Sequence, residues 1–194
     1  MTLLQEAIAR FHEEYRDAQT CGLAAPTSMT LATADRTGRP AARTVLLKHA
    51  DERGFVFFTN LESRKGHDLR DNPRAALCFH WAPLEKQVIV EGDVTAVTTA
   101  EADAYWATRP RDSQIGAWAS LQSKPLARRS VFLERVDEVN RQYAGQNVPR
   151  PPHWSGFRVD PHRIEFWKGM PHRLHDRLVY EKTSGAWLKT LLYP

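Results

Sequence analysis

The sequence predicts a mainly β fold with α-helical additions, in which an antiparallel β-barrel is flanked by helices. Seven to nine short β-rich segments run along the chain, and most of them are joined by tight turns. The helical patterns lie at the start and in the middle of the chain, whereas a parallel sheet would require them to alternate with the strands. Together these two observations favour an antiparallel barrel.

Length and composition indicate a single domain over residues 1–194, because 194 residues of which 42% are hydrophobic can bury one substantial core. No run of about 18 apolar residues is present, so we expect a cytoplasmic protein without a membrane partner. Cys21 and Cys78 form no C-x-x-C pattern, which argues against a zinc site and a disulfide framework. No metal is expected.

The net charge of +4 permits an anionic partner. The basic residues are scattered in pairs, however, and form neither a basic tract nor a known nucleic-acid motif. A small molecule with several negative charges explains such pairs better than a nucleic acid does.

The first half of the chain begins with an amphipathic helix over residues 2–20, which starts at a capping-box pattern of Thr2 and Gln5. Turn-rich segments then separate the next predicted strands, and Ser63 can cap a short helix that ends before Pro73. The predicted elements are strands 28–34, 41–48 and 55–60, helix 64–70, and strands 75–81 and 87–97.

In the second half, Pro110 ends a helix that starts at Thr99, and Asp112 or Ser113 can start another. A long helix over 124–143 follows, and a proline-rich connector leads to C-terminal strands within 155–192. These strands are 156–159, 163–167, 172–181 and 187–192.

Two groups of residues could hold phosphate. Arg64 and Lys65 fall in the first turn of a helix, where cations oppose the helix dipole unless an anion is bound. Tyr105 and Arg109 are four residues apart with Ser113 just beyond, and this trio could grip a phosphate. The alternative interpretation is solvated side chains at helix ends.

The stretch from Trp167 to Arg177 carries a third group. On an extended strand Arg173, His175 and Arg177 would share one face, about 6.6 Å apart, and would favour an anion across them. A solvated edge strand is the alternative. No catalytic or nucleotide-binding motif occurs, so any reaction is expected to depend on a bound cofactor.

Six separated motifs give the chain a resemblance to a known family. They are RTVLLK (43–48), SRKGHDLRDNPR (63–74), RPRDSQIGAW (109–118), Gln122-Ser123, FWKG (166–169) and HRLHDR (172–177). In order and approximate spacing they resemble the pyridoxamine 5′-phosphate oxidases, from about Leu23 onward.

The resemblance implies an FMN-binding split β-barrel of Greek-key type, working as a homodimer with FMN at the subunit interface. The implied FMN contacts are Arg43, Thr44, Val45, Leu46, Leu47, Lys48, Phe58, Thr59, Arg64, Lys65, Gln87, Gln122, Ser123, Trp167 and Arg177. Guanidinium and ammonium groups among them suit the FMN phosphate.

The same resemblance implies Lys48, Tyr105, Arg109 and Ser113 around the phosphate of a phosphorylated pyridine substrate. Arg173 and His175 would lie over its ring as the catalytic pair. The implied reaction oxidises pyridoxamine or pyridoxine 5′-phosphate to pyridoxal 5′-phosphate by hydride transfer from C4′ to flavin N5, and O2 is reduced to hydrogen peroxide.

Two other functions stay open: an FMN oxidase of another substrate, as in phenazine biosynthesis, and a non-enzymatic FMN or pyridoxal phosphate binding protein. Retention of Tyr105, Arg109 and Ser113 favours the phosphorylated pyridine. The pattern departs from the family at Leu191, where relatives commonly carry Arg, and the chain starts at the helix that many relatives precede with a substrate-covering extension.

Overall fold

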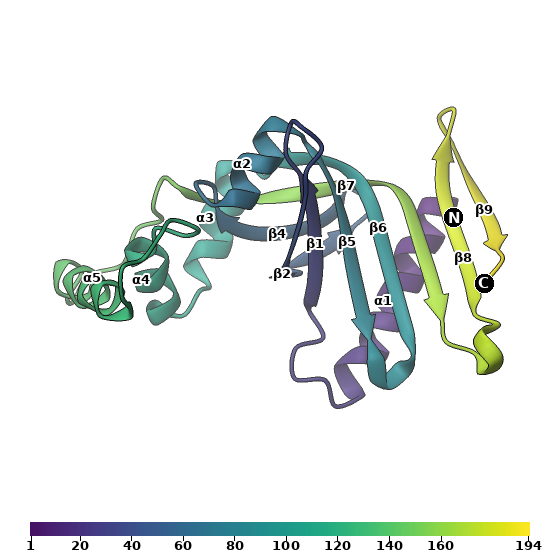
Figure 1. The fold of residues 1–194 in the computed structure, drawn as a ribbon, viewed down its shortest axis with the longest axis horizontal. Coiled ribbons are helices and arrows are strands. Elements are labelled where there is room, and N and C mark those ends of the chain that lie inside the picture. The colour runs from purple at the N-terminus through teal and green to yellow at the C-terminus, as the bar shows by residue number, and fades with distance from the viewer.

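The computed structural model describes all residues 1–194, and its sheet closes on itself (Figure 1). The hydrogen-bonded strand order is β2-β1-β5-β6-β7-β4-β3, and every pairing is antiparallel. The two strands at the ends of this path, β2 (Pro40–Leu46) and β3 (His49–Asp51), are consecutive in the chain. Only residues 47–48 separate them, so the chain itself joins the two ends of the sheet into a barrel. The predicted mainly β antiparallel fold is confirmed.

The other barrel strands match the sequence expectations to within one or two residues. Turn chemistry explains this agreement: the Asp35 carboxylate accepts hydrogen bonds from the backbone N–H groups of Thr37 and Arg39, which fixes the first hairpin. These strands are β1 (Ser28–Ala34), β4 (Gly54–Asn60), β5 (Arg74–Trp81) and β6 (Lys86–Ala96).

Strand β7 (Trp154–Lys168) unites two segments that the sequence predicts as separate strands, 156–159 and 163–167. The separation was wrong because the register with β6 shifts between Glu91 and Gly92: Pro161 pairs with Gly92 and Arg163 pairs with Glu91, so His162 forms a bulge and the strand continues past Pro161. The first half of β7 pairs with β4 and the second half pairs with β8. This one strand therefore connects the barrel to the C-terminal hairpin.

The C-terminal hairpin consists of β8 (Asp176–Thr183) and β9 (Ala186–Leu192). The prediction that a strand begins at His172 was wrong. Pro171 starts a short 3-10 turn, η2 (Pro171–Arg173), in which His172 and Arg173 have φ values of 60° and 62°. Two consecutive left-handed residues turn the chain, so the proposed common face of Arg173, His175 and Arg177 does not form.

Helix α1 (Leu3–Thr20) begins with the predicted capping box of Thr2 and Gln5. It packs its apolar side against the barrel, where Phe11 lies edge-on to Phe55 and Phe79 at ring distances of 4.9 and 5.1 Å. These residues belong to one core cluster of 23 buried side chains. No helix of the structure combines the length and the apolar character needed to cross a membrane.

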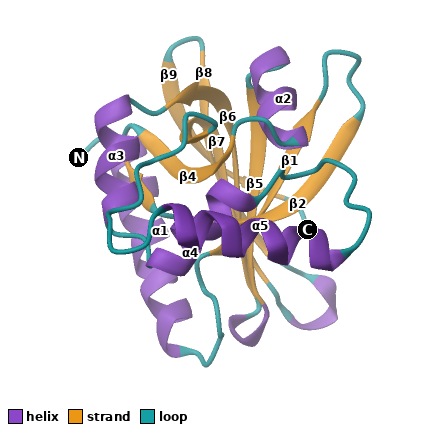
Figure 2. Ribbon diagram, turned by 90° about the vertical axis from the view of Figure 1, so that its left-hand side faces the viewer, coloured by secondary structure: helices purple, strands orange, loops and turns teal.

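The remaining helices are α2 (Arg64–Asp71), α3 (Thr99–Ala107), α4 (Arg111–Ala119) and α5 (Arg129–Gln142), and a short turn, η1 (Ala82–Leu84), precedes β6. Helix α5 starts five residues later than predicted. Ser123, directly before the predicted start, has a φ of 73°, and its Oγ accepts a hydrogen bond from the backbone N–H of Arg64. Figure 1 shows α4 and α5 at one end of the long axis and the β8–β9 hairpin at the other, and Figure 2 shows α4 and α5 crossing in front of the barrel.

Candidate active site

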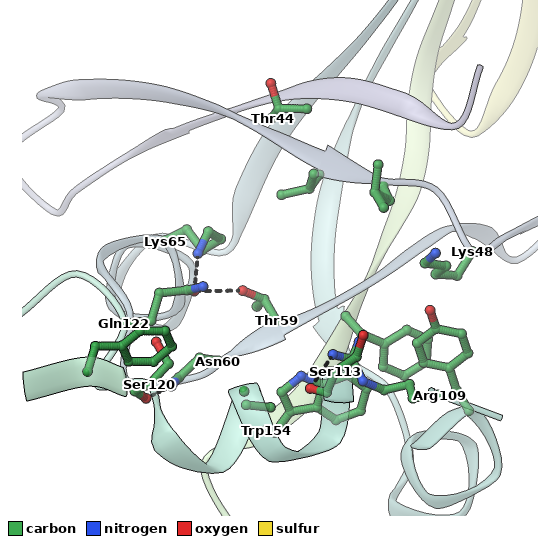
Figure 3. Close-up of a pocket in the computed structure, with 17 residues that line it drawn as sticks. Thr44, Lys48, Thr59, Asn60, Lys65, Arg109, Ser113, Ser120, Gln122 and Trp154 are labelled. Carbon is green, nitrogen blue, oxygen red and sulfur yellow. Dashed lines mark hydrogen bonds between the residues drawn. The ribbon is translucent and has the colours of Figure 1, made fainter. Parts of the chain in front are cut away.

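A cavity of about 460 Å³ lies between the barrel and the helices α3 to α5. Strands β2 and β4 supply one wall, and α3, α4 and the segment after α4 supply the other (Figure 3). Of the residues expected from the sequence, the cavity is lined by Thr44, Val45, Leu46, Lys48, Phe58, Thr59, Lys65, Tyr105, Arg109, Ser113 and Gln122. The fold thus brings together residues from four of the six motifs.

Three stacked aromatic rings form an apolar wall of this cavity. The rings of Phe58, Tyr105 and Trp154 are nearly parallel and mutually in contact: Phe58 lies 4.2 Å from Tyr105 and 5.3 Å from Trp154, with interplanar angles of 18° and 6°, and Tyr105 lies 6.0 Å from Trp154. The aromatic position 58 therefore contributes its ring to the site. Such a wall suits a planar heteroaromatic ligand.

Lys65 is the cationic group at one end of the cavity. Its side chain reaches from the first turn of α2, and the residue is only 8% exposed. Its Nζ donates to Ser63 Oγ at 2.9 Å and to Gln122 Oε1 at 2.7 Å, which are both neutral acceptors. Burial, with the nearby charge of Arg43, lowers the pKa of Lys65 from 10.5 to about 8.

Ser63 does not cap α2 as the sequence predicts. Its Oγ donates to the carbonyl oxygen of Asn60 at 2.6 Å and accepts from Lys65, while Ser123 Oγ accepts the N–H of Arg64 at 3.2 Å. The start of α2 is therefore tied to the segment after α4 by Gln122 and Ser123. This arrangement places the first turn of α2 at the end of the cavity.

Arg43 lies behind Lys65 and does not line the cavity. Its guanidinium donates to Thr33 Oγ1 at 2.7 Å and pairs with Asp68 at 3.4 Å. Burial lowers the pKa of Arg43, and the charge of Asp68 opposes that effect. Leu47 also lies outside the cavity, because its side chain is in the barrel core and its N–H donates to Thr27.

Arg109 and Lys48 lie at the opposite end of the cavity, as Figure 3 shows. The Arg109 guanidinium lies 4.8 Å from the centre of the Trp154 ring, and its Nη2 donates to the backbone oxygen of Ser113 at 3.0 Å. Its Nε is buried without any hydrogen-bond partner, and burial lowers its pKa. Lys48 Nζ lies 5.5 Å from the Tyr105 ring.

The remaining expected residues lie outside this cavity. Gln87, Trp167 and Arg177 are directly cross-strand neighbours on β6, β7 and β8, so they form one row at the hairpin side of the sheet. The His175 ring lies 4.7 Å from that of Trp167, and its Nδ1 accepts the backbone N–H of Met170 at 3.2 Å. A neutral His175 must therefore carry its proton on Nε2.

Within one chain most of the expected site falls into two groups, which we name the cavity group and the hairpin group. The cavity group is the set of eleven expected residues that line the cavity. Arg43, Leu47, Arg64 and Ser123 belong to neither group, because they lie beside the cavity without lining it. The hairpin group is Gln87, Trp167, Arg173, His175 and Arg177, of which Arg173 is exposed. One chain by itself does not join the two groups into one pocket.

Sequence reasoning missed several cavity residues. Trp154 closes the aromatic stack, and Asn60 Nδ2 donates to the backbone oxygen of Ser120 at 3.4 Å, which ties β4 to the end of α4. The other missed lining residues are Gly116, Ala117 and Phe132. The only sequence signal was the position of Trp154, two residues after the proline-rich connector, and it gave no direction for the side chain.

The cations and the aromatic wall of the cavity can be compared with what a flavin mononucleotide, a planar ring system with a phosphate, requires. Lys65 and Arg109 are cations at opposite ends of one cavity, and neither is hydrogen-bonded to a carboxylate. Cationic groups that are buried in whole or in part and have no carboxylate hydrogen-bond partner favour a bound anion, and a flat ring system matches the aromatic wall of the cavity. The residues therefore fit one or two phosphate-bearing aromatic molecules. A closed antiparallel barrel with such a cavity defines the class of split-barrel proteins that bind phosphorylated aromatic cofactors.

Comparison with known proteins identifies the family. Residues 15–143 match the family model described as pyridoxamine 5′-phosphate oxidase, and residues 154–194 match the pyridoxine 5′-phosphate oxidase C-terminal dimerisation region. The chain is 57% identical to the pyridoxine/pyridoxamine 5′-phosphate oxidase of Alkalilimnicola ehrlichii, over 100% of both chains. It is 58% identical to that of Myxococcus xanthus, over 97% of this chain and 92% of the relative.

Among solved structures, PhzG from Burkholderia lata in complex with tetrahydrophenazine-1-carboxylic acid superposes with a TM-score of 0.91. That structure is 31% identical, and the match covers 96% of this chain and 92% of PhzG. An FMN-binding protein from Nostoc punctiforme, 19% identical over 100% and 99% of the two chains, shares the fold with a TM-score of 0.76. The chain belongs to the pyridoxamine 5′-phosphate oxidase family.

Proposed function

We propose that this protein is an FMN-dependent oxidase that converts pyridoxamine 5′-phosphate and pyridoxine 5′-phosphate to pyridoxal 5′-phosphate. The observation that carries the proposal is a pair of cations at the two ends of one aromatic-walled cavity: Lys65, which is buried, and Arg109, whose Nε is buried without a hydrogen-bond partner. Two phosphate-bearing molecules, the cofactor and the substrate, supply the anions that these cations lack. The family membership and the names of the relatives support the same reaction.

FMN would be held at the Lys65 end. The Lys65 ammonium and the side chain of Arg64 suit its phosphate, and Arg43 adds positive charge behind them. Thr59 and Gln122, which already hydrogen-bond to each other at 3.4 Å, offer a hydroxyl and an amide to a polar ligand edge. The backbone of residues 44–46, on the cavity wall, can bond to the ring edge.

The substrate phosphate would be held at the other end by Lys48, Tyr105, Arg109 and Ser113. Arg109 is the main anchor because its buried Nε still lacks an acceptor. Phosphate recognition lies away from the reacting carbon, so its binding energy can orient C4′ without altering the chemistry there.

The protein acts as a homodimer, in keeping with the match of its last residues to a dimerisation region. We place the cofactor and substrate between subunits, where the hairpin group of one subunit completes the cavity group of its partner. This arrangement explains why Arg173, His175 and Arg177 lie outside the cavity of their own chain. We also treat residues 1–194 as one domain, since β7 pairs with the barrel and the hairpin alike, and as a cytoplasmic one.

When bound, FMN supplies the redox chemistry, taking a hydride from substrate C4′ at its N5 and returning the electrons to O2 as hydrogen peroxide. The protein side chains bind and orient. Arg173 and His175 would act on the pyridine ring, with His175 donating a hydrogen bond from Nε2 because Nδ1 already accepts from Met170. The aromatic wall around Phe58 excludes water from the ring system.

The test is aerobic turnover of both phosphorylated substrates by FMN-loaded protein, with the aldehyde and the peroxide measured together. We expect equal amounts of both products. Pyridoxine and pyridoxamine without phosphate serve as matched controls, and we expect much higher KM values for them. Absence of turnover with both phosphorylated compounds would contradict the proposal.

A second candidate is an oxidase of a phenazine precursor, which the PhzG structure favours by its similarity. The phosphate-binding set at Lys48, Tyr105, Arg109 and Ser113 argues against it. Turnover of a tetrahydrophenazine carboxylic acid in place of the pyridines would favour this candidate. FMN binding without any turnover would favour a binding protein.

A further inference from the structure

A chain of ion pairs crosses the hairpin side of the sheet beside Arg177. Arg163 Nη1 pairs with Glu91 at 2.8 Å and its Nη2 pairs with Glu165 Oε2 at 2.6 Å, while Arg177 Nε donates to Glu165 Oε1 at 2.7 Å. Both oxygens of Glu165 are therefore occupied, each by a different arginine. The chain links the three strands β6, β7 and β8.

Glu165 is the central member of this chain and is 3% exposed. A carboxylate in that position is strongly disfavoured unless its charge is matched. Burial raises the pKa of Glu165, but the hydrogen bonds from Arg177 and Arg163 outweigh burial and keep the pKa below its ordinary value. Glu165 is thus a buried, charged carboxylate that is held in place by ion pairs with Arg163 and Arg177.

The Arg177 guanidinium has a second fixed contact. Its Nη1 donates to the backbone oxygen of Tyr193, in the last residues of the chain, at 3.3 Å. Glu165 and Tyr193 together use two of the five N–H groups of the guanidinium, and the Nη2 group makes no hydrogen bond within the chain. The side chain is still 31% exposed, so the free edge can meet a ligand.

We propose that Glu165 is a positioning residue for the cofactor site: it fixes the Arg177 guanidinium so that its free edge faces the flavin held by the partner subunit. This inference rests on the proposed function, because it takes Arg177 as a flavin contact. An arginine on an exposed hairpin would otherwise sample several rotamers, and ordering it on binding would reduce affinity. Glu165 and Arg163 provide that order before the ligand arrives.

The experiment is a double-mutant cycle on FMN affinity, measured by flavin fluorescence with cofactor-free dimer. Glu165→Gln removes the charge at nearly constant shape, and we expect FMN affinity to fall about tenfold, as for other groups that orient a ligand-binding residue. Arg177→Ala should lower the affinity at least as much. In the Arg177→Ala background, Glu165→Gln should change the affinity by less than about twofold, because its effect passes through Arg177.

Glu101→Gln is the matched control. Glu101 pairs with the half-buried Arg158 of the same strand β7 at 2.7 Å, and a glutamine keeps the capping box of α3. We expect its FMN affinity to equal that of the wild type. A general effect of lost ion pairs on β7 would instead weaken FMN binding in this variant as well.

If Glu165→Gln does not give a folded dimer, the double substitution Arg163→Met with Glu165→Met removes the buried carboxylate and its half-buried arginine partner together. We expect the same loss of FMN affinity, and again no added loss in the Arg177→Ala background. Wild-type affinity in the Glu165 variants, or a full additional loss without Arg177, would overturn the inference. Failure of the wild-type protein to bind FMN would overturn the proposed function instead.

Discussion

Lys65 gives the sharpest test of the cavity, through the substitution Lys65→Met. Methionine has nearly the same length and shape as lysine but carries no charge and donates no hydrogen bond. The Lys65 ammonium is buried, with only Ser63 and Gln122 as partners. The substitution therefore removes a buried cation that has no carboxylate hydrogen-bond partner at the cofactor end of the cavity.

The size of the effect on folding stability follows from the pKa of Lys65, which is lowered from 10.5 to about 8. At 1.36 kcal/mol for each pKa unit, burying this charged lysine costs about 3 kcal/mol in the cofactor-free protein. Because the folded pKa is the lower one, the cost is complete below about pH 8. It disappears as the pH rises through the unfolded value of 10.5. Lys65→Met should therefore raise the free energy of unfolding of the cofactor-free protein at neutral pH.

FMN affinity should fall in the same variant, although the cofactor-free protein becomes more stable. A charged hydrogen bond to phosphate contributes about 1.5 to 3 kcal/mol, so Lys65→Met should weaken FMN roughly 10- to 150-fold at neutral pH. Wild-type affinity should also fall as the pH rises above about 8, where the free Lys65 loses its proton. The variant should lack this pH dependence.

The assays are urea unfolding of cofactor-free protein and flavin fluorescence titration across the same pH range. Lys65→Arg is the matched control, since it keeps the charge and should retain most of the affinity. A Lys65→Met protein that is less stable without cofactor, or that binds FMN as tightly as the wild type, would refute the reasoning about this cation.

Three further predictions concern the substrate end and the start of α2. Arg109→Ala should remove a charged hydrogen bond worth about 1.5 to 3 kcal/mol and so raise the KM for pyridoxine 5′-phosphate roughly 10- to 150-fold, with FMN affinity unchanged. An unchanged KM in steady-state kinetics would remove Arg109 from the phosphate site. Tyr105→Phe keeps the ring contact with Phe58 but loses the hydroxyl. If the hydroxyl makes a neutral hydrogen bond to the substrate, its loss costs about 0.5 to 1.5 kcal/mol, so the KM for pyridoxine 5′-phosphate should rise only about 2- to 13-fold. A larger rise would contradict a neutral hydrogen bond. Gly66→Ala would push a methyl group into the Leu61 carbonyl and should lower stability by about 1 to 3 kcal/mol in thermal unfolding; an unchanged melting temperature would show that α2 can shift freely.

The barrel was predictable from sequence because its signals are local. Turn residues such as Asp35 and the capping pair Thr2 and Gln5 act within a few residues, and the structure confirms both. The continuity of β7 across Pro161 was not predictable, because it depends on a bulge against β6. The late start of α5 has a similar cause, since Ser123 serves a helix 59 residues away in sequence.

The site was predictable in part. Spacing alone suggested that Tyr105, Arg109 and Ser113 could meet, and all three line the cavity. The lack of carboxylate partners around Lys65 is a property of packing and has no local signal. The same holds for Glu165: Arg163 lies two residues away on the same strand, but the second arginine, Arg177, reaches Glu165 only because β7 pairs with β8.

The central claim is that the cavity group of one subunit and the hairpin group of its partner form a single site. Mixed dimers test it directly: Lys65→Met and Arg177→Ala protomers are unfolded together, refolded and assayed for aerobic turnover of pyridoxine 5′-phosphate, at an FMN concentration that saturates the wild type but is too low to load either variant homodimer. Each mixed dimer should contain one site built only from unaltered groups, so random mixing should restore about a quarter of wild-type activity. No activity above that of the separate variants would contradict a site shared between subunits.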